Sequence, residues 1–508
     1  MTALDLDKRP QPCRLSELAH FLRAERTLNP ANPVIRSVVQ DSRQVEPGAL
    51  FVAVPGEKTD GHRYVAQAVK QGASALVCQI IPHPAPACPV IQVSDAREAL
   101  SALAAAFHGF PSCHLRLTGV TGTDGKTSTT HILRAILEEA GRTAATIGTL
   151  GYAFADRQID SDLTTPDPLA LHRSMAGMLE AGVSDVCMEV SSHSLVLKRV
   201  AHLDFDAAVL TNITRDHLDF HVTREQYARA KRMLFEMLDP DAVAVLPAAG
   251  EFHASFADAT AAQVLTYGID ELADVTGRVL SMGMDGTTMS VRTPFESYTV
   301  RTPLAGVYNC QNILAAVTAA FGFGIEGESV ASAMNAFRGV PGRLERVRVP
   351  GRADLPAVVV DYAHTPGALD KVLRTLRPLV KGKLICLIGC GGDRDRTKRP
   401  IMGRIATEQA DVAVFTADNS RSESTEDIID QMVAGVSSDL AEYYVEPDRR
   451  KAIRLAICMA RSQQSLVALC GRGCERYQKI GGRSIPFDDR TVAREIMSAI
   501  PASRRRGA

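Results

Sequence analysis

Short apolar runs, separated by glycine, proline and polar turn signals, recur through most of the chain. Runs of this kind are typical of buried strands, and here they alternate with segments of helical period. The alternation predicts parallel sheets whose strands are joined by crossover helices. One series of strands is predicted at residues 115–120, 186–190, 207–210 and 243–246, and a second at residues 358–360, 384–388, 412–415 and 466–469.

The first hundred or so residues predict a smaller α/β unit. Apolar runs at 38–39 and 50–54 are bounded by turn signals, and a helical run over 97–107 ends before Gly109. Residues 264–302 differ, because they combine β-branched stretches and glycine turns with little helical period. We expect this segment to form an antiparallel appendage to the middle sheet.

These shifts in pattern divide the chain into three α/β domains. One boundary follows the first helical run, and the other follows the helix at 309–323 and a proline-glycine turn near residue 341. We predict domains over residues 1–112, 113–345 and 346–508, with a mostly parallel sheet in the second and a second doubly wound sheet in the third. A length of 508 residues fits this number at about 100–200 residues per domain.

Composition narrows the choice of partners. The 57 Lys and Arg nearly balance the 58 Asp and Glu, so no global basic field is available to bind nucleic acid or an anionic membrane, and an anionic ligand must be held locally. The eleven cysteines are scattered without metal-type pairs, and the first residues lack a signal-peptide pattern, which favours a reducing cytosol. No stretch approaches the ~18 apolar residues of a membrane span.

The sharpest motif is Gly119-Val-Thr-Gly-Thr-Asp-Gly-Lys-Thr-Ser128, between a predicted strand and a predicted helix. Glycines permit positive φ and close approach of the backbone to an anion, Lys126 adds a point charge, and a hydroxyl of Thr127 or Ser128 can bind Mg²⁺. Val120 stands where the common phosphate-loop pattern has its first glycine. The sequence predicts a variant phosphate loop for a triphosphate; a glycine turn with an incidental lysine is the alternative.

Candidate metal ligands follow the next two strands. Glu189 ends an apolar strand at the carboxyl edge, where α/β folds bind ligands. The segment after the following strand contains Asn212, Asp216, His217, Asp219 and His221. Oxygen ligands of this kind suit Mg²⁺, whereas the two histidines alone also fit a zinc pair or a helix-surface pair. Lys231 lies in a helical segment, and composition alone predicts a solvated lysine.

Four further motifs occur in order along the chain. They are Met188-Glu-Val-Ser-Ser-His-Ser-Leu195, Asp361-Tyr-Ala-His-Thr-Pro366, Gly389-Cys-Gly-Gly-Asp-Arg-Asp-Arg-Thr-Lys-Arg-Pro400 and Asp418-Asn-Ser-Arg-Ser-Glu423. With the phosphate loop, they resemble the Mur ligases, the family that builds the peptide stem of peptidoglycan precursors in the bacterial cytosol. The resemblance covers nearly the whole chain and is strongest to members that add 2,6-diaminopimelate.

The resemblance implies a uridine-nucleotide domain, a central phosphate-loop ATPase and a C-terminal Rossmann-like domain for the incoming amino acid. The implied enzyme is a monomeric, cytoplasmic ligase that uses ATP and Mg²⁺ to join meso-diaminopimelate to the D-glutamate of UDP-N-acetylmuramoyl-L-Ala-D-Glu through an acyl phosphate. Alternatives are a lysine-adding member and a ligase similar to folylpolyglutamate synthase. A non-catalytic nucleotide switch would lack the metal-side carboxylate and lysine, but Glu189 and Lys231 are present.

Site residues are likewise implied position by position. The implied ATP site comprises Gly122, Thr123, Asp124, Gly125, Lys126, Thr127, Ser128, Asn309, Arg343 and Asp361. The resemblance implies that catalysis and Mg²⁺ binding involve Lys126, Glu189, His217, Lys231 as a carbamate, and Thr127 or Ser128. The muramoyl-dipeptide site comprises Ser42, Glu57, Lys58, Thr59, Thr164, Thr165, Ser191, Leu197 and Arg199. Without the resemblance, residues 41–43 are also consistent with a polar turn, and residues 164–165 with an ordinary loop before a proline.

The implied diaminopimelate site comprises Arg394, Asp418, Asn419, Ser420, Arg421, Gly471 and Glu475. A guanidinium binds a carboxylate through two parallel hydrogen bonds, so Arg421 would favour an amino acid whose far end carries a carboxylate. Glu475 would accept a hydrogen bond from the distal ammonium.

Three departures from the family pattern stand out. Asp124 replaces the usual Asn of the loop, so its side chain must point away from the phosphates or cap the helix. Ser420 replaces a proline, which loosens the turn before Arg421. Leu163 and Leu197 stand where the family often offers amides to the substrate.

Overall fold

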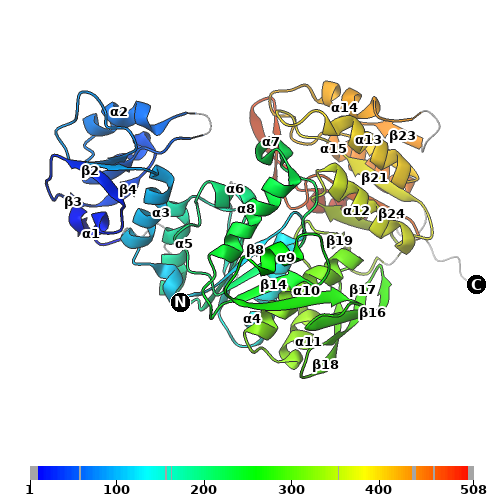
Figure 1. Cartoon of the computed structure of the whole chain (residues 1–508). Coiled ribbons are helices and arrows are strands. Elements are labelled where there is room, and N and C mark those ends of the chain that lie inside the picture. Colours follow the sequence, from blue (N-terminus) through cyan, green and yellow to red (C-terminus); the bar gives the residue numbers. More distant parts are fainter. Residues whose placement is uncertain are drawn as a thin grey trace, which may run out of the picture. The chain divides into compact units, whose positions relative to one another are not determined.

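The computed structural model describes residues 10–56, 59–154, 157–161, 163–352, 354–437, 442–460 and 464–501. Its contacts divide the chain into two compact units. The first comprises residues 1–276, 292–297 and 312–333, and the second comprises residues 277–291, 298–311 and 334–508. Figure 1 labels the helices and strands along the chain. Among the described helices, none has the length and apolar character needed to cross a bilayer.

A five-stranded sheet opens the first unit. Its strands are β2 (Ala24–Leu28), β7 (Val90–Val93), β6 (Ala75–Cys78), β5 (Ala49–Val52) and β4 (Ser37–Val39), in this order. The pairs from β4 to β7 are parallel, and β2 runs antiparallel to β7. Helix α3 (Ala96–Phe107) begins at Asp95, which accepts hydrogen bonds from two backbone N–H groups, and it buries Leu100 and Leu103 against the sheet core. The predicted strands and helix of this segment are confirmed. The smaller elements are β1 (Cys13–Arg14), β3 (Val34–Ile35), α1 (Leu15–Ala19) and α2 (Val65–Lys70).

An eleven-stranded sheet follows, in the order β11-β10-β9-β12-β8-β13-β14-β15-β16-β17-β18. Its strands are β8 (Arg116–Thr121), β9 (Ala144–Gly148), β10 (Gly151–Phe154), β11 (Arg157–Ile159), β12 (Asp185–Glu189), β13 (Ala207–Leu210), β14 (Val243–Pro247), β15 (Gln263–Ile269), β16 (Val275–Gly283), β17 (Gly286–Arg292) and β18 (Ser297–Thr302). The helices are α4 (Lys126–Glu139), α5 (Pro168–Glu180), α6 (Ser192–Val196), α7 (Leu218–His221), α8 (Arg224–Glu236), α9 (His253–Ala257), α10 (Val307–Gly322) and α11 (Gly327–Ala336).

The centre of this sheet is parallel from β9 to β15. The four predicted strands of the series are confirmed, and their residues are almost entirely buried. The expected antiparallel appendage from residue 264 is wrong at its start, because β15 pairs parallel to β14. The crossover between these two strands contains only the five-residue helix α9, which is too short to show a helical period in the sequence.

Helix α4 is held by a narrow apolar stripe. Ile132, Leu133, Ile136 and Leu137 lie at i, i+1, i+4 and i+5, on one face, and each is at most 1% exposed. The helix packs against β9 and β12. The strand-loop-helix unit predicted from the sequence is confirmed.

The second unit contains a six-stranded sheet in the order β19-β20-β24-β21-β22-β23. Its strands are β19 (Glu345–Val347), β20 (Ala357–Asp361), β24 (Leu466–Cys470), β21 (Leu384–Ile388), β22 (Val412–Phe415) and β23 (Glu442–Val445). All pairs are parallel except β19 with β20. Helices α12 (Pro366–Leu376), α13 (Lys398–Gln409) and α14 (Thr425–Val433) share one core cluster, whereas α15 (Arg449–Met459) and α16 (Asp489–Ala499) share another. The sheet is therefore doubly wound, as predicted, and the α/β fold class is confirmed. A hairpin of β25 (Tyr477–Ile480) and β26 (Arg483–Pro486) accompanies it.

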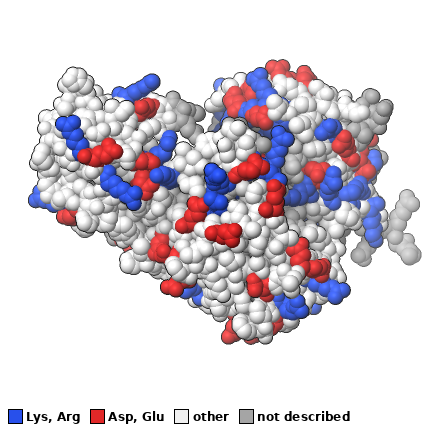
Figure 2. Space-filling model, in the orientation of Figure 1, with Lys and Arg blue, Asp and Glu red and all other residues white. Residues whose placement is uncertain are grey.

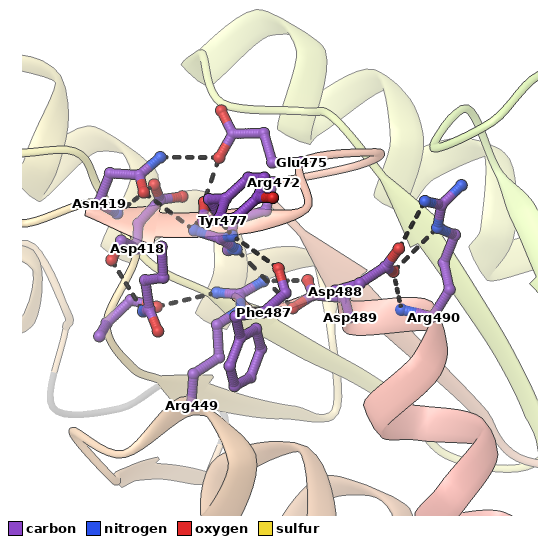
Figure 3. A network of polar contacts seen from close by, with 12 residues as sticks. Asp418, Asn419, Arg449, Arg472, Glu475, Tyr477, Phe487, Asp488, Asp489 and Arg490 are labelled. Atoms are coloured by element: carbon purple, nitrogen blue, oxygen red, sulfur yellow. Dashed lines mark hydrogen bonds and ion pairs between the residues drawn. The ribbon is translucent and has the colours of Figure 1, made fainter. Parts of the chain in front are cut away.

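Charge is mixed on the surface. Basic and acidic side chains are interspersed over the face drawn in Figure 2. This distribution agrees with the nearly balanced charge of the whole chain. Concentrated charge lies instead inside the second unit, where Arg449 and Asp489 form an ion pair with both side chains 0% exposed (Figure 3).

The Arg449 guanidinium is fully engaged. It donates to both Asp489 carboxylate oxygens at 2.8 and 2.6 Å and to the carbonyl oxygens of Ala417 and Cys470, each at 3.1 Å. These carbonyls lie at the carboxyl ends of β22 and β24. A buried guanidinium that loses its carboxylate is left as an uncompensated charge.

We predict that Asp489→Ala lowers the free energy of unfolding by about 3–5 kcal/mol, because Arg449 stays buried without its counter-ion. Urea unfolding followed by circular dichroism measures the loss. The control is Glu495→Ala on the same helix, which removes an exposed pair with Arg450 and should cost less than about 1 kcal/mol. Equal losses in the two variants would contradict the prediction.

Candidate functional site

The phosphate-loop motif joins β8 to α4 through a turn that requires glycine. Gly122 has φ +147°, and a Cβ there would lie 1.9 Å from Thr211 Oγ1. Gly125 has φ +88°, and its Cβ would lie 2.2 Å from Asn312 Oδ1. Both positions thus exclude other residues by backbone conformation and by space. The loop leaves the sheet at the carboxyl end of β8 and leads directly to the helix N-terminus.

Residues that follow β13 hold this loop in place. Thr211 Oγ1 donates to the Asp124 carbonyl at 2.6 Å, and Asn212 Nδ2 donates to the same oxygen at 3.0 Å. The Asp124 N–H donates in return to Asn212 Oδ1 at 3.1 Å. Gly125 is the N-cap of α4 and has no side chain with which to cap the helix. The expectation that the Asp124 side chain points away from the phosphates or caps the helix stays a prediction.

Two lysines converge on the loop. Lys126 Nζ donates to the carbonyls of Gly122 and Thr123, both at 2.8 Å, and Lys231 Nζ donates to the Gly122 carbonyl at 2.8 Å. Lys231 is 1% exposed and lies 4.4 Å from the Tyr227 ring centroid. The interpretation of Lys231 as a solvated lysine is therefore wrong. Burial, with the positive charge of Lys126, lowers the pKa of Lys231 well below its ordinary value.

Glu189 lies at the same sheet edge. It ends β12 opposite Val120 of β8, and its side chain is buried. The Thr149 N–H donates to Oε1 at 2.7 Å and the Thr149 hydroxyl to Oε2 at 3.2 Å. A Cβ on Gly148 would lie 2.3 Å from Oε1, so the β9 end is shaped around this carboxylate.

A hydroxyl cluster adjoins Glu189. Thr165 Oγ1 donates to the Glu189 carbonyl at 2.8 Å and accepts from the Ser191 N–H at 3.0 Å. Arg199 donates to the Thr165 carbonyl at 2.9 Å, and the hydroxyls of Thr164 and Thr149 lie 3.1 Å apart. The structure thus brings together four of the predicted muramoyl-dipeptide residues beside Glu189. Leu197 is the C-cap residue that follows α6 in the same segment, and Leu163 is 43% exposed.

The histidines form an aromatic group. His193 lies 4.8 Å from His217 and 5.5 Å from His221, measured between ring centroids. His221 is buried, and its Nε2 lies 2.9 Å from Ser192 Oγ, so the helix-surface interpretation is wrong for it. The side chain of His217 is 48% exposed. Among the described residues, no group of three or more His, Cys, Asp or Glu side chains is arranged so that it could hold a metal ion. The side chain of Asp219 lies outside the described residues.

The remaining residues predicted for the uridine substrate lie in the N-terminal segment. Ser42 is buried and its hydroxyl lies 3.3 Å from Gln67 Oε1, while Asp41 caps the short turn of helix and pairs with Arg43. Thr59 Oγ1 lies 3.1 Å from the Tyr64 hydroxyl. Glu57 and Lys58 lie outside the described residues.

The second unit gathers the predicted amino-acid site at the carboxyl ends of β22 and β24. Asn419 Nδ2 donates to Glu475 Oε2 at 2.7 Å (Figure 3), and a Cβ on Gly471 would lie 2.9 Å from Asp418 Oδ2. Arg472 fixes Asn419 by donating to its Oδ1 at 3.1 Å. Burial and the neighbouring Asp418 carboxylate raise the pKa of Glu475. Two carboxyl groups that crowd each other in this way favour a bound cation.

Arg421 and Arg394 lie against one glycine nearby. A Cβ on Gly391 would be 3.0 Å from Arg421 Nη1 and 3.8 Å from Arg394 Cγ. Arg421 has φ +51°, and its Nη1 donates to the Gly392 carbonyl at 2.6 Å. Ser420, which replaces the family's proline, is 1% exposed, and its hydroxyl has no partner among the described residues.

The last predicted ATP residues also belong to the second unit. Asp361 accepts from the backbone N–H groups of Leu344 and Ala363 at 2.7 and 2.8 Å. Arg343 lies over the Tyr362 ring at 4.6 Å, and Asn309 is buried and donates to the Ala305 carbonyl at 2.8 Å. Their role at a nucleotide stays a prediction.

Some residues of the site escaped the sequence analysis. Thr149 holds Glu189, Thr211 holds the phosphate loop, and Arg472 holds Asn419. Each acts on a partner at least forty residues away in the sequence, and although Arg472 lies between the predicted residues Gly471 and Glu475, none of the three was itself a predicted site residue. Only the positions of Thr149 and Thr211, directly after predicted or buried strands, gave a usable signal.

Three segments match domains of one family. Residues 34–108 match "Mur ligase family, catalytic domain", residues 120–320 match "Mur ligase middle domain", and residues 342–473 match "Mur ligase, glutamate ligase domain". The chain is a Mur ligase. Matches to all three domains of the family, in order, also agree with the motifs on which the resemblance rests.

Individual Mur ligases resemble the chain over most of its length. The UDP-N-acetylmuramoyl-L-alanyl-D-glutamate–2,6-diaminopimelate ligase of Geobacillus thermodenitrificans is 43% identical over 470 residues, which cover 91% of this chain and 95% of that one. The Bacillus cereus ligase of the same name is 41% identical and covers 92% and 95%. A solved structure of a ligase with this name matches with a TM-score of 0.67 and 30% identity, over 92% and 95% of the two chains.

More distant Mur and related ligases share only the fold. The MurF ligase from Thermotoga maritima in complex with ADP has a TM-score of 0.60 at 19% identity, covering 91% and 96% of the two chains. The folylpolyglutamate synthase from the same organism has a TM-score of 0.58 at 15% identity, covering 79% and 93%.

We predict that Gly122→Ala weakens ATP binding at least about tenfold, because the added methyl group must displace Thr211 and with it the loop. Titration with a fluorescent ATP analogue measures the affinity. The control is Gly141→Ala, which has φ +79° and no atom within 4 Å of the added Cβ, so it tests backbone strain without the clash. Equal affinities of Gly122→Ala and the wild type would contradict the prediction.

Proposed function

We propose that this Mur ligase adds meso-diaminopimelate to UDP-N-acetylmuramoyl-L-Ala-D-Glu, with ATP as the co-substrate, in the synthesis of peptidoglycan precursors. The observation that carries the proposal is the identity of more than 40% with ligases of this name over at least nine tenths of each chain. The geometry of the two clusters supports it, because one is suited to phosphate and the other to a substrate with both a carboxylate and an ammonium.

The chemistry requires activation of an acid. A carboxylate is a poor acceptor for an amine because its leaving group would be oxide. Transfer of the γ-phosphoryl group of ATP to the D-glutamyl carboxylate gives an acyl phosphate and ADP, and attack of the amine then forms the amide and releases phosphate. The protein must mainly neutralise and orient crowded negative charge. The backbone of Gly122–Ser128 and the ammonium of Lys126 supply donors for that purpose.

A magnesium ion is part of the proposal. The buried residues Thr127 and Ser128 lie in the first turn of α4, after the loop that follows β8, and Glu189 ends the neighbouring strand β12. Their hydroxyl and carboxylate oxygens fit a Mg²⁺ ion that completes its shell with phosphate oxygens and water. His217 and the carbamate form of Lys231 would add ligands. The bound ion would neutralise developing phosphate charge.

Lys231 is suited to carbamylation. A neutral amine, and not an ammonium, attacks CO₂, and the amine then loses a proton to give the carbamate anion. Burial lowers the pKa of Lys231 and so favours the neutral amine. The resulting anion would sit beside the positive charge of Lys126.

Selection of the amino acid is proposed for the second unit. Arg421 would bind the distal carboxylate of diaminopimelate, and Arg394 flanks the same glycine. Glu475, with Asp418 and Asn419 beside it, would accept the distal ammonium. Lysine lacks the distal carboxylate, so this arrangement favours diaminopimelate over a lysine-adding activity.

Other functions are less well supported. The likeness to folylpolyglutamate synthase is one of fold, at 15% identity. A nucleotide switch without chemistry leaves the buried Glu189 and Lys231 at the loop unexplained.

We further propose that the protein is a monomer in the cytoplasm and that it acts on small molecules, without nucleic-acid or membrane partners.

Phosphate release from ATP tests the proposal directly. We expect release with UDP-N-acetylmuramoyl-L-Ala-D-Glu and meso-diaminopimelate together, much less with lysine in place of diaminopimelate, and almost none without the muramoyl dipeptide or after chelation of Mg²⁺. A coupled assay for inorganic phosphate measures the rates, and mass spectrometry identifies the product. A rate with lysine equal to that with diaminopimelate would favour the lysine-adding alternative.

We predict that Lys231→Ala abolishes turnover and that short carboxylic acids such as acetate partly restore it, because they replace the carbamate anion in the space left by the side chain. The same phosphate-release assay, with and without acetate, measures the effect. Arg229→Ala, an exposed position on the same helix, is the control and should keep the wild-type rate. Full activity of Lys231→Ala without acetate would exclude the carbamate.

A further inference from the structure

Two loops of the second unit carry the arginines assigned to the amino acid. The loop at 391–394 follows β21 and carries Arg394, and the loop at 419–423 follows β22 and carries Arg421. Asp393 has φ +53° and Arg421 has φ +51°, so each loop contains a non-glycine residue in the left-handed region. Such conformations persist only where surrounding contacts enforce them.

The two loops are joined by a ladder of hydrogen bonds. The Gly392 N–H donates to the Asn419 carbonyl at 2.9 Å, and Arg421 donates back to the Gly392 carbonyl at 2.6 Å. The Asp393 carboxylate accepts from the backbone N–H and the hydroxyl of Ser422. These hydrogen bonds connect the two loops directly to each other.

A buried arginine, Arg399, holds the two hydrogen-bonded loops together. Arg399, in the first turn of α13, has a side chain that is 0% exposed and makes a forked pair with Glu423 at 3.0 and 2.9 Å. Glu423 Oε1 also accepts from the Asp393 N–H at 2.6 Å, and Arg399 Nη2 donates to the Gly391 carbonyl at 3.2 Å. Arg399 further donates to Gln431 of α14 at 2.8 Å. One guanidinium thus contacts both loops and a second helix.

Neither Arg399 nor Glu423 is available to touch the amino acid with its charged group. Arg399 is enclosed, and both Glu423 oxygens are occupied by Arg399, with the exposed Arg396 at 3.1 Å from one of them. The hydrogen bonds from Arg399 hold the pKa of Glu423 at about 2, so this acceptor stays ionised. The pair acts on recognition only through the loops it holds.

We propose that Arg399 is a positioning residue for substrate selection: through Glu423 it holds the loops of Arg394 and Arg421 in register, so that both guanidinia face the distal carboxylate. The inference rests on the proposed function and names a residue that determines its specificity. A lysine at this position keeps the charge but loses the planar fork, and therefore cannot hold both loops at once.

Arg399→Lys tests the proposal by selectivity. We expect the KM for meso-diaminopimelate to rise at least about tenfold, and the ratio of kcat/KM for diaminopimelate to that for lysine to fall by a similar factor, while the KM for ATP changes less than about twofold. The control is Arg404→Lys, an exposed arginine on the same helix, which should leave all three values unchanged.

Two further variants guard against misfolding. Glu423→Gln keeps the shape of the buried partner, and Asp393→Asn weakens only the exposed contact with Ser422; both should lower the same selectivity ratio, the second by less. Thermal midpoints are measured in parallel. A lowered midpoint with wild-type selectivity in the folded variants would overturn the positioning role and leave the proposed function standing. Absence of diaminopimelate-dependent turnover in the wild type would overturn both.

Discussion

Two lysine side chains that meet at one backbone oxygen are the constraint on which the first unit depends. The Gly122 carbonyl accepts hydrogen bonds from the Nζ atoms of both Lys126 and Lys231, and Lys231 is buried. Two positive charges this close in a poorly solvated place would repel each other, so burial and Lys126 lower the pKa of Lys231, and an anion bound beside the two side chains is stabilised. The glycines of the loop, the N-terminus of α4 and Glu189 then determine where such an anion and its counter-ions can bind.

The parallel sheet makes this concentration possible. Strands β9, β12, β8 and β13 end side by side, so Thr149, Glu189, the phosphate loop and Thr211 meet at one edge although they are spread over about a hundred residues. Each apolar strand is anchored by burial on both faces, and its first polar residue is therefore fixed in space. The second unit has a similar arrangement, because Gly471 directly follows β24 and Asp418 lies three residues after the end of β22.

The sequence predicts most of the strands because they are short, wholly apolar and buried; residues 207–210, 384–388 and 412–415 agree with the structure at both ends. It fails where a property depends on distant partners. The helix that carries Lys231 is polar on average, and only contact with Gly122, 109 positions earlier, makes that lysine a buried one. The roles of Thr149 and Arg399 likewise depend on distant partners, because Thr149 binds Glu189 and Arg399 binds Glu423. The start of β15 was misassigned because its crossover helix has too few residues to show a period.

The buried ion pair of Arg449 and Asp489 connects the stability of the second unit to its proposed amino-acid site. Arg449 also binds the carbonyls of Ala417 and Cys470, the residues immediately before Asp418 and Gly471. The guanidinium of the buried pair therefore binds the backbone directly before two residues of the proposed amino-acid site. Under the proposed function, a substitution that disturbs Arg449 or Asp489 would therefore affect both the folding of the second unit and the placement of its amino-acid site.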